Sequence, residues 1–331
     1  MSQPRSPQRR QFVLGGIAAA TLAATSTRAL AADYPDRPIT FICPWPAGGT
    51  ADRSMRAICQ IASRELGQSV VVDNRAGASG MIGTKALAMA KPDGYTIGQI
   101  PISVTRFSQL GTVQIDPMKD LSYLARSNGQ TFGIAVQADS RFRSLAEVVA
   151  AAKAKPGEIT YAHAGVGGAT HVGMEQFALA AGIKLNAIAY KGGSAALQDV
   201  LANQVDLLAD SSSWAPHVEA GKMRLLAVWS EARAPRFKDA PTLKELGYDV
   251  VVEAPNGIGA PAGLPPAVEK RLRDAFRNAI ASAEFRTVCD SIDSPVMYLD
   301  GPAYRKYVQD VYKQETGLIQ RLNLKELMAK G

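Results

Sequence analysis

The chain is poor in the residues that build disulfide scaffolds and metal centres. Of its 331 residues, only three are cysteine and three are histidine. Cys43, Cys59 and Cys289 are too few for a disulfide framework and too far apart for a CxxC pair. We interpret them as small buried apolar residues, although an oxidising compartment would permit one bridge. Their spacing leaves that choice open.

Motifs of the common enzyme classes are also missing. The sequence contains no HExxH, GxSxG or Walker A pattern, and the run GVGG at 165–168 breaks the GxGxxG spacing. One hydrolase alternative combines His171, Asp206 and a serine at 211–213, but nothing in the sequence places these side chains together. We therefore expect a protein that is not an enzyme and that holds no metal and no cofactor.

No apolar run approaches the roughly 20 residues that span a bilayer. The first 31 residues nevertheless form a recognisable pattern. Arg9 and Arg10 precede a small apolar run at 15–25, and an A-x-A site ends at Ala31. This pattern predicts a Tat-type signal peptide over residues 1–31, cleaved after about Ala31, and hence export to the periplasm. The alternative is a membrane anchor, but the apolar run at 15–25 is too short to span a bilayer.

The charge balance does not point to a nucleic-acid partner. The net charge is +7, but four arginines and no acidic residue lie within 1–31, so the rest of the chain carries +3. That part has no dense basic stripe with interleaved aromatic residues, and we expect no nucleic-acid binding. With 47% hydrophobic and 20% charged residues, the full chain has a globular composition and enough length for two domains.

Strand and helix patterns alternate in the first part of this chain. Residues 39–43, 69–73 and 95–100 have the character of strands, and helical periodicity separates them at 50–66 and 80–90. This order predicts a parallel sheet covered by helices.

A second unit of the same class begins at the strand 132–136. Ser144 and Glu147 form a capping box that opens a helix, and strands follow at 159–162, 185–189, 205–209 and 225–228. The glycine-rich run 257–263 is interpreted as a segment that crosses back to the first unit. Helices at 265–282 and 302–322 then close the chain.

Glycines gather where strands lead into helices, at 48–49, 77–83, 165–168 and 192–193. Ligands of open α/β sheets bind beyond the carboxyl ends of the strands. Glycine lets backbone N–H groups approach a ligand, and the helix dipole favours an anion there. The turn Gly48–Gly49 therefore predicts a carboxylate site. The alternative is a tight turn in which Asp52 only complements the helix dipole.

An ordered set of short motifs resembles the extracytoplasmic solute receptors of the tripartite tricarboxylate transporter family, often called Bug-type binding proteins. The resemblance covers essentially all of the chain after the signal. The matching motifs are YPDRPI at 34–39, PWPAGG at 44–49 with Asp52, NR at 74–75, PDGYT at 92–96, DP at 116–117, AKAKPG at 152–157, Tyr161 with Gly165 and His171, YKG at 190–192 with QVD at 204–206, and APAG at 260–263.

This resemblance implies two open α/β domains joined by two crossing strands, a periplasmic binding protein of the Venus-flytrap type. We expect domain 1 at 32–134 and 258–331 and domain 2 at 135–257. The implied function is capture of a small organic acid, aliphatic or aromatic, and its delivery to the membrane components of a tripartite tricarboxylate transporter. We expect a monomer. A ligand-sensing subunit for a signalling partner is the alternative.

The resemblance also implies a set of ligand-binding residues around the cleft. These are Trp45, Gly48, Gly49, Asp52, Ala78, Ser79, Gly80, Gly167, Gly168, Thr170, His171, Asp206 and Asp210. His171 has the alternative of a buried structural histidine. Two departures from the family pattern concern the ligand, namely Met81, which we interpret as a core residue, and Arg106.

Arg106 is a further candidate, because it follows a strand end near the implied cleft. A guanidinium can clamp a carboxylate through two parallel hydrogen bonds. We expect Arg106 to bind the distal carboxylate of a dicarboxylate ligand. The alternative is a surface or interdomain arginine.

Overall fold

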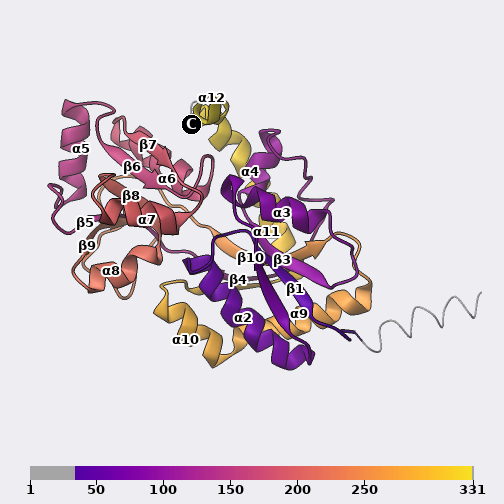
Figure 1. The fold of residues 1–331 in the computed structure, drawn as a ribbon. Helices are drawn as coiled ribbons and strands as arrows, with labels where there is room; N and C mark the ends of the chain where they lie inside the picture. The colour runs from indigo at the N-terminus through magenta and orange to yellow at the C-terminus, as the bar shows by residue number, and fades with distance from the viewer. Residues whose placement is uncertain (1–33, 330–331) are drawn as a thin grey trace, which may run out of the picture.

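The computed structural model describes residues 34–329 and has two α/β domains, each built on one sheet (Figure 1). The predicted signal at 1–31 lies outside the described residues. The first sheet has the order β11-β4-β10-β3-β1-β2 and the second has the order β7-β6-β8-β5-β9. The strands are β1 (Ile39–Cys43), β2 (Val70–Asn74), β3 (Thr96–Pro101), β4 (Leu121–Gly129), β5 (Phe132–Gln137), β6 (Thr160–His163), β7 (Asn186–Ala189), β8 (Leu207–Ser211), β9 (Met223–Val228), β10 (Pro255–Pro261) and β11 (Val296–Asp300).

The two sheets are mixed rather than wholly parallel, which corrects one expectation. β1 pairs in parallel with β2 and β3, and β6 pairs in parallel with β7 and β8, as the alternating order predicted. However, β10 runs antiparallel to both β3 and β4, and β5 runs antiparallel to β8 and β9. The reason is the double crossing, because the chain leaves the first domain along β4 and returns along β10 beside it.

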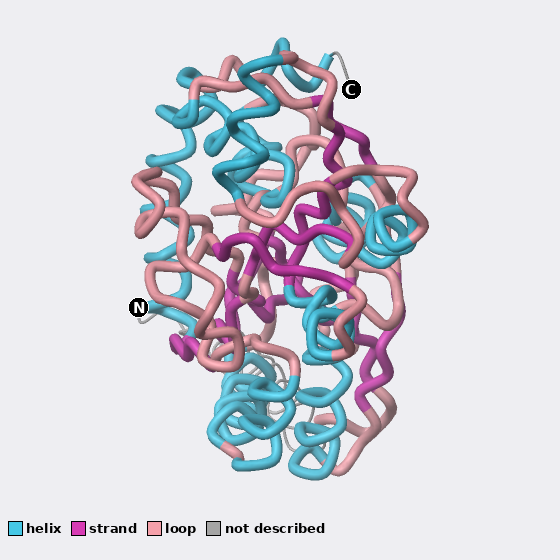
Figure 2. The backbone as a smooth tube through the Cα atoms, turned by 90° about the vertical axis from the view of Figure 1, so that its left-hand side faces the viewer, coloured by secondary structure: helices cyan, strands magenta, loops and turns pink. Residues whose placement is uncertain are grey.

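Helices pack against both sheets, and many of the strands run through the middle of the molecule (Figure 2). The helices of the first domain are α2 (Thr50–Leu66), α3 (Met81–Ala88), α4 (Val104–Gln109), α9 (Pro266–Ala281), α10 (Ala283–Ser291), α11 (Gly301–Arg321) and α12 (Leu324–Ala329). The helices of the second domain are α5 (Leu145–Ala154), α6 (Ala169–Ala181), α7 (Gly193–Leu201) and α8 (Ala215–Glu219). Each domain also has a short 3-10 turn, η2 (Ala78–Gly80) in the first and η3 (Ser212–Trp214) in the second. No helix in the described range is long and apolar enough to cross a membrane.

Local sequence signals explain where several helices begin and end. The amide of Glu147 donates to the Ser144 hydroxyl at 3.3 Å, so Ser144 is the N-cap, as the predicted capping box required. The reciprocal bond differs, because the Glu147 carboxylate accepts from the Arg143 amide at 2.6 Å, one residue before the cap. Helix α2 ends at Gly67, whose φ of 73° is the left-handed conformation that glycine adopts without strain.

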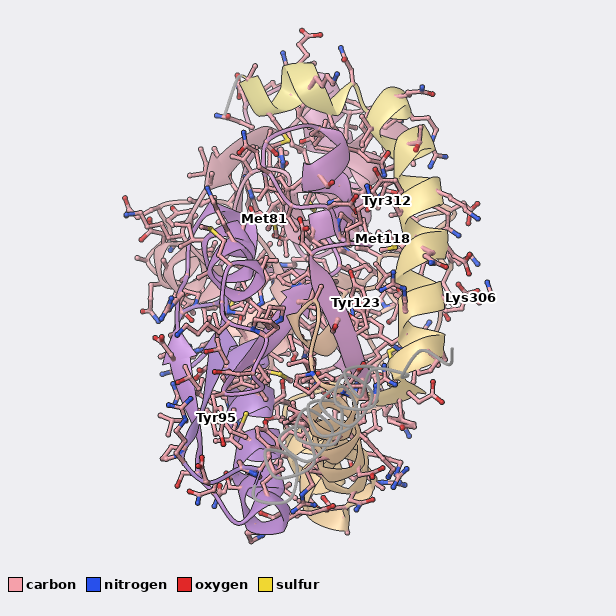
Figure 3. All side chains as sticks on the ribbon, turned by 90° about the vertical axis from the view of Figure 1, so that its right-hand side faces the viewer. Met81, Tyr95, Met118, Tyr123, Lys306 and Tyr312 are labelled. Carbon is pink, nitrogen blue, oxygen red and sulfur yellow. The ribbon has the colours of Figure 1, made fainter. Side chains whose placement is uncertain are left out.

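The sheet of the first domain is packed on both faces. On one face α2 and α9 bury Met55 and Phe276 against the sheet. On the other, α11 runs along the flank and Tyr304 packs edge-on against Tyr123 at 5.1 Å between ring centroids (Figure 3). Met81 is buried in this second cluster, as the core interpretation predicted.

The two crossings between the domains lie side by side. β4 passes into β5 through two residues, and Gln130 donates its amide hydrogen to the Ala254 carbonyl at 3.2 Å, just before β10 begins. The chain thus leaves the first sheet after Gly129, enters the second at Phe132 and rejoins the first at Pro255, whereas the domain bounds were expected at 134 and 258. All three cysteines are buried free thiols, and burial raises the pKa of Cys43 and Cys289 to about 12.

Candidate ligand pocket between the domains

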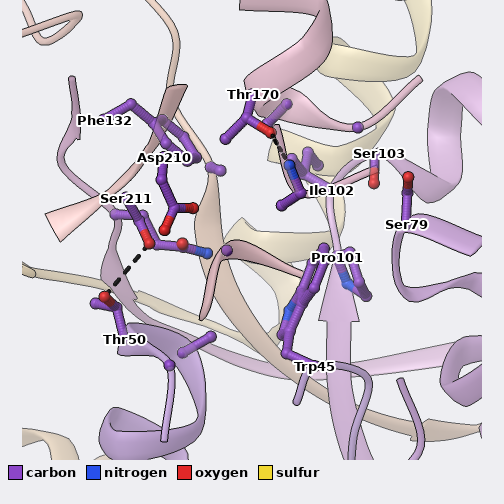
Figure 4. A pocket seen from close by; sticks show the side chains of 18 of the residues that line it. Trp45, Thr50, Ser79, Pro101, Ile102, Ser103, Phe132, Thr170, Asp210 and Ser211 are labelled. Carbon is purple, nitrogen blue, oxygen red and sulfur yellow. Dashed lines mark hydrogen bonds between the residues drawn. The ribbon is translucent and has the colours of Figure 1, made fainter. Parts of the chain in front are cut away.

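A pocket of about 80 Å³ lies where the two domains meet beside the crossings (Figure 4). The first domain, the second domain and the crossing segments all contribute to its wall. Its lining residues are Trp45, Pro46, Gly49, Thr50, Ala51, Ser79, Gln99, Pro101, Ile102, Ser103, Gln130, Phe132, Ala164, Gly168, Ala169, Thr170, Gly193, Ser194, Asp210, Ser211, Ala254 and Pro255.

Three helices begin at this pocket. α2 starts there from the first domain, and α6 and α7 start there from the second. Their N-cap residues are Gly49, Gly168 and Gly192, and none of them supplies a side-chain cap to the first turn. Uncapped N–H groups and the positive ends of three helix dipoles therefore face one small space, which is an arrangement that favours an anion.

The lining contains no lysine, arginine or histidine, and Asp210 is its one ionisable side chain. The neutral donors include the indole N–H of Trp45, which is buried and has no hydrogen-bond partner among the described residues. An unmade hydrogen bond on a buried donor costs about 1–3 kcal/mol. The pocket can hold an anion through dipoles and neutral donors alone.

Side-chain hydrogen bonds join the domains on several sides of the pocket. The Ser79 hydroxyl donates to the Val166 carbonyl at 2.8 Å, and Ser211 and Thr50 are joined through their hydroxyls at 3.3 Å. Further away, the Ser212 hydroxyl donates to the Ile292 carbonyl. The structure therefore has the two domains closed against each other.

Six of the expected site residues line the pocket: Trp45, Gly49, Ser79, Gly168, Thr170 and Asp210. They come from both domains and from positions 45 to 210 of the chain. Their contact with a ligand stays a prediction. The other eight expected residues are Gly48, Asp52, Ala78, Gly80, Arg106, Gly167, His171 and Asp206, and none of these is part of the lining.

Asp52 holds the turn in front of α2 rather than facing the pocket. Its carboxylate is 2% exposed and accepts from the Gly48 amide at 2.9 Å, from Arg56 at 3.0 Å and from the Asn74 side chain at 2.8 Å. Gly48 has a φ of 84°, so this turn requires a glycine. The turn thereby fixes the start of α2, and with it the N–H groups at Gly49 and Thr50.

Gly80 and Ala78 flank Ser79 but play other parts. A Cβ atom on Gly80 would lie 3.0 Å from Pro101 and 3.4 Å from Trp45, so the glycine permits these two lining residues to pack closely. Ala78 is exposed. Neither residue is part of the pocket lining, and their contact with a ligand stays a prediction.

His171 and His163 accept hydrogen bonds from the backbone of the glycine loop at 165–168. Nδ1 of His171 accepts from the Gly167 amide at 3.0 Å, and Nδ1 of His163 accepts from the Gly165 amide at 3.3 Å. The two rings stack at 4.5 Å. Burial lowers the pKa of His163 to about 3 and that of His171 to about 4, so both imidazoles are neutral acceptors near pH 7. His171 is a buried structural histidine, as its alternative interpretation stated.

Arg106 is committed to protein partners, which corrects the expectation that it binds the distal carboxylate. Its guanidinium donates to both carboxylate oxygens of Glu315 on α11, at 2.7 and 2.8 Å. A third bond goes to the Gly167 carbonyl of the second domain at 2.8 Å. The alternative of an interdomain arginine is therefore the arrangement in the structure. Glu315 lies 209 positions away in the chain, and no local pattern indicates it.

Asp206 lies at the opposite end of β6 from the pocket. It accepts from the Thr160 amide and the Thr160 hydroxyl, both at 2.9 Å. The hydrolase alternative required His171, Asp206 and a serine together, but within the described residues they share no hydrogen bond and only Ser211 of the serines reaches the pocket.

Sequence reasoning missed several lining residues. Gly193 and Ser194 start α7, and the glycines at 192–193 were a usable signal, since they follow a strand end. The sequence contains no signal for Gln99, Pro101 and Phe132, because they are ordinary strand residues. They reach the pocket only because the fold brings β3 and β5 to it.

The two-domain architecture and the interdomain pocket define a solute-binding protein of the periplasmic type. The solved structure of the periplasmic binding protein BugD superposes with a TM-score of 0.84 and 29% identity, covering 88% of this chain and 99% of BugD. R. palustris Rpa4515, solved with adipate, has a TM-score of 0.83 and 26% identity over 88% of this chain and 99% of its own.

The sequence comparisons name the family. Residues 54–324 match the model for the tripartite tricarboxylate transporter family receptor. A curated relative, the UPF0065 protein in gbd 5'region of Cupriavidus necator, is 38% identical over 322 residues, which are 96% of this chain and 98% of the relative. The chain therefore belongs to the receptor family of the tripartite tricarboxylate transporters, as its motifs predicted, and is a solute receptor.

Proposed function

We propose that this receptor captures a small organic acid in the periplasm and delivers it to the membrane components of a tripartite tricarboxylate transporter. The observation that carries the proposal is the set of three glycine-capped helix N-termini at one closed pocket. Such N-termini favour carboxylates without a basic side chain. The signal pattern at 1–31 supports export, and family membership supports the transporter.

A dicarboxylate remains part of the proposal, now without Arg106. The first domain offers the start of α2 and the second offers the start of α6, so each domain presents its own anion position. A ligand with a carboxylate at each end would bridge the domains and stabilise their closure. The adipate in Rpa4515, a protein of the same fold, is a dicarboxylate of this kind.

Thermal unfolding of protein without residues 1–31, refolded to remove carried-over ligand, tests the capture. Aliphatic and aromatic mono- and dicarboxylates are screened against uncharged analogues of equal length, such as 1,6-hexanediol beside adipate. An acid at 100 times its Kd should stabilise the folded state by about 2.7 kcal/mol, and its diol should not. If no acid raises the melting temperature, or acid and diol act alike, the proposal fails.

Closure and delivery need separate measurements. A saturating acid should reduce the radius of gyration in solution scattering, because the ligand bridges the two domains. Identical profiles with and without the acid would contradict a flytrap. Uptake of that acid by cells with and without the receptor gene tests delivery, and equal uptake would count against the transport role.

A further inference from the structure

Asp210 is a buried carboxylate in a pocket that is otherwise suited to anions. It lies near the end of β8 and is 4% exposed. Its carboxylate points into the pocket (Figure 4) and packs against Gly193 at the start of α7, where a Cβ atom would lie 2.1 Å from Oδ2. One of the three anion positions is therefore already occupied by the protein.

The partners of Asp210 leave it without a counter-charge. The Ser213 hydroxyl donates to Oδ2, and the Ser211 amide supplies a backbone hydrogen bond. No basic group of the described residues forms an ion pair with it, although other buried acids such as Glu315 have one. Loss of water raises the pKa of Asp210 to about 6, and the two hydrogen bonds oppose this rise.

A ligand group beside Asp210 therefore meets an acceptor with spare capacity. A carboxylate accepts about four hydrogen bonds, and the described residues supply two, from Ser213 and Ser211. A second bare carboxylate at this point would place like charges together in a buried site, which is costly. A hydroxyl or an ammonium group would instead donate to Asp210, and an ammonium group would also neutralise it.

Resting on the proposed function, we propose that the acid bound here also carries a hydrogen-bond donor, a hydroxyl or an ammonium group, and that Asp210 accepts it. The carboxylates bind at the starts of α2 and α6, and the donor faces α7. Asp210 thus selects substituted acids over plain ones of the same length.

Isothermal titration of the protein with matched acids tests this selection. Each set has one carbon chain with hydrogen, hydroxyl or ammonium at carbon 2: succinate, malate and aspartate; glutarate, 2-hydroxyglutarate and glutamate; adipate, 2-hydroxyadipate and 2-aminoadipate. In at least one set, a donor-bearing acid should bind ten- to a hundredfold more tightly than the plain acid. Plain acids that bind as tightly in every set would overturn the inference.

The variant Asp210→Asn separates the two donors. Its amide oxygen still accepts from a hydroxyl, but the charge that attracts ammonium is lost. The ammonium acid should lose at least tenfold in affinity, the hydroxy acid less, and the plain acid nothing. The control Asp206→Asn makes the same change on an acid that bonds Thr160 outside the pocket, and the order of affinities should stay unchanged. An Asp210→Asn variant with the selectivity of the parent would refute the role.

The pH dependence tests the same idea in the unmodified protein. As the pH falls from 7.5 to 5.5, Asp210 becomes protonated, so the affinity for the ammonium acid should fall and the affinity for the plain acid should rise. On the elements packed against β8, His163 and His171 stay neutral over this range, and Glu175 and Asp199 each accept from a tyrosine hydroxyl. Parallel pH profiles for both acids would overturn the inference. If no carboxylate binds at any pH, the proposed function itself fails, whereas carboxylate binding without a donor preference removes only this inference.

Discussion

Arg106→Met should lower the free energy of unfolding by about 3–5 kcal/mol, because it leaves the Glu315 carboxylate buried without its partner. The two side chains are only 8% and 7% exposed, and their paired bonds are 2.7 and 2.8 Å long. A charge pair of this kind adds little net stability over apolar residues of similar size. Removal of one member, however, leaves the other charge buried without a partner.

Urea unfolding of the parent, the two single variants, the double variant and one control variant measures this effect. Arg106→Met and Glu315→Leu should each be strongly destabilised, and the double variant should lose far less than the two losses added together. Arg233→Met is the matched control, since its partner Glu245 is exposed and water screens that pair. A loss below about 1 kcal/mol for Arg106→Met, or strictly additive losses, would refute the buried-pair argument.

The same variant also tests the corrected role of Arg106 in ligand binding. Its bond to the Gly167 carbonyl crosses the domain interface, so its loss should weaken the closed state. Hydrogen bonds to charged groups contribute about 1.5–3 kcal/mol, so affinity should fall about ten- to a hundredfold for mono- and dicarboxylates alike. A selective loss of dicarboxylates in calorimetry would restore the direct role that the structure argues against.

Three further changes have defined outcomes. The free energy of unfolding should fall as the pH drops from about 6.5 towards 4, because His163 and His171 bind protons more readily in the unfolded chain. The variant His171→Gln should flatten this dependence, measured as the free energy of unfolding against pH. An unchanged dependence would contradict the role of a neutral His171 as a buried acceptor. Gly49→Val should fold normally at its φ of −71° but bind any acid at least tenfold more weakly, since its side chain fills the gap towards the second domain; calorimetry showing full affinity would be inconsistent with this. Replacing Arg9 and Arg10 with lysine should retain the precursor in the cytoplasm, and normal export in cell fractionation would refute a Tat signal.

The regular elements were largely predictable, because their signals are local. The first strand, at 39–43, and the helix at 50–66 have the predicted ends. β4 was missed because Ser127 and Asn128 make the C-terminal end of its sequence polar. These two side chains are buried through hydrogen bonds to Asn256 and Ser294, which are more than 120 positions away. A pattern of neighbouring residues cannot report such partners.

The sequence by itself determined the turns around the ligand pocket. Glycines at strand ends and at helix starts specify backbone conformation within a few residues, so Gly49 and Gly168 could be assigned to a site before any fold was known. The roles of charged residues were decided only by the tertiary structure. Arg106 is paired with an acid 209 positions away, whereas Asp210 is buried without a counter-charge. Burial and pairing depend on segments that only the fold brings together, and these two properties decide whether a charge stabilises the fold or faces a ligand.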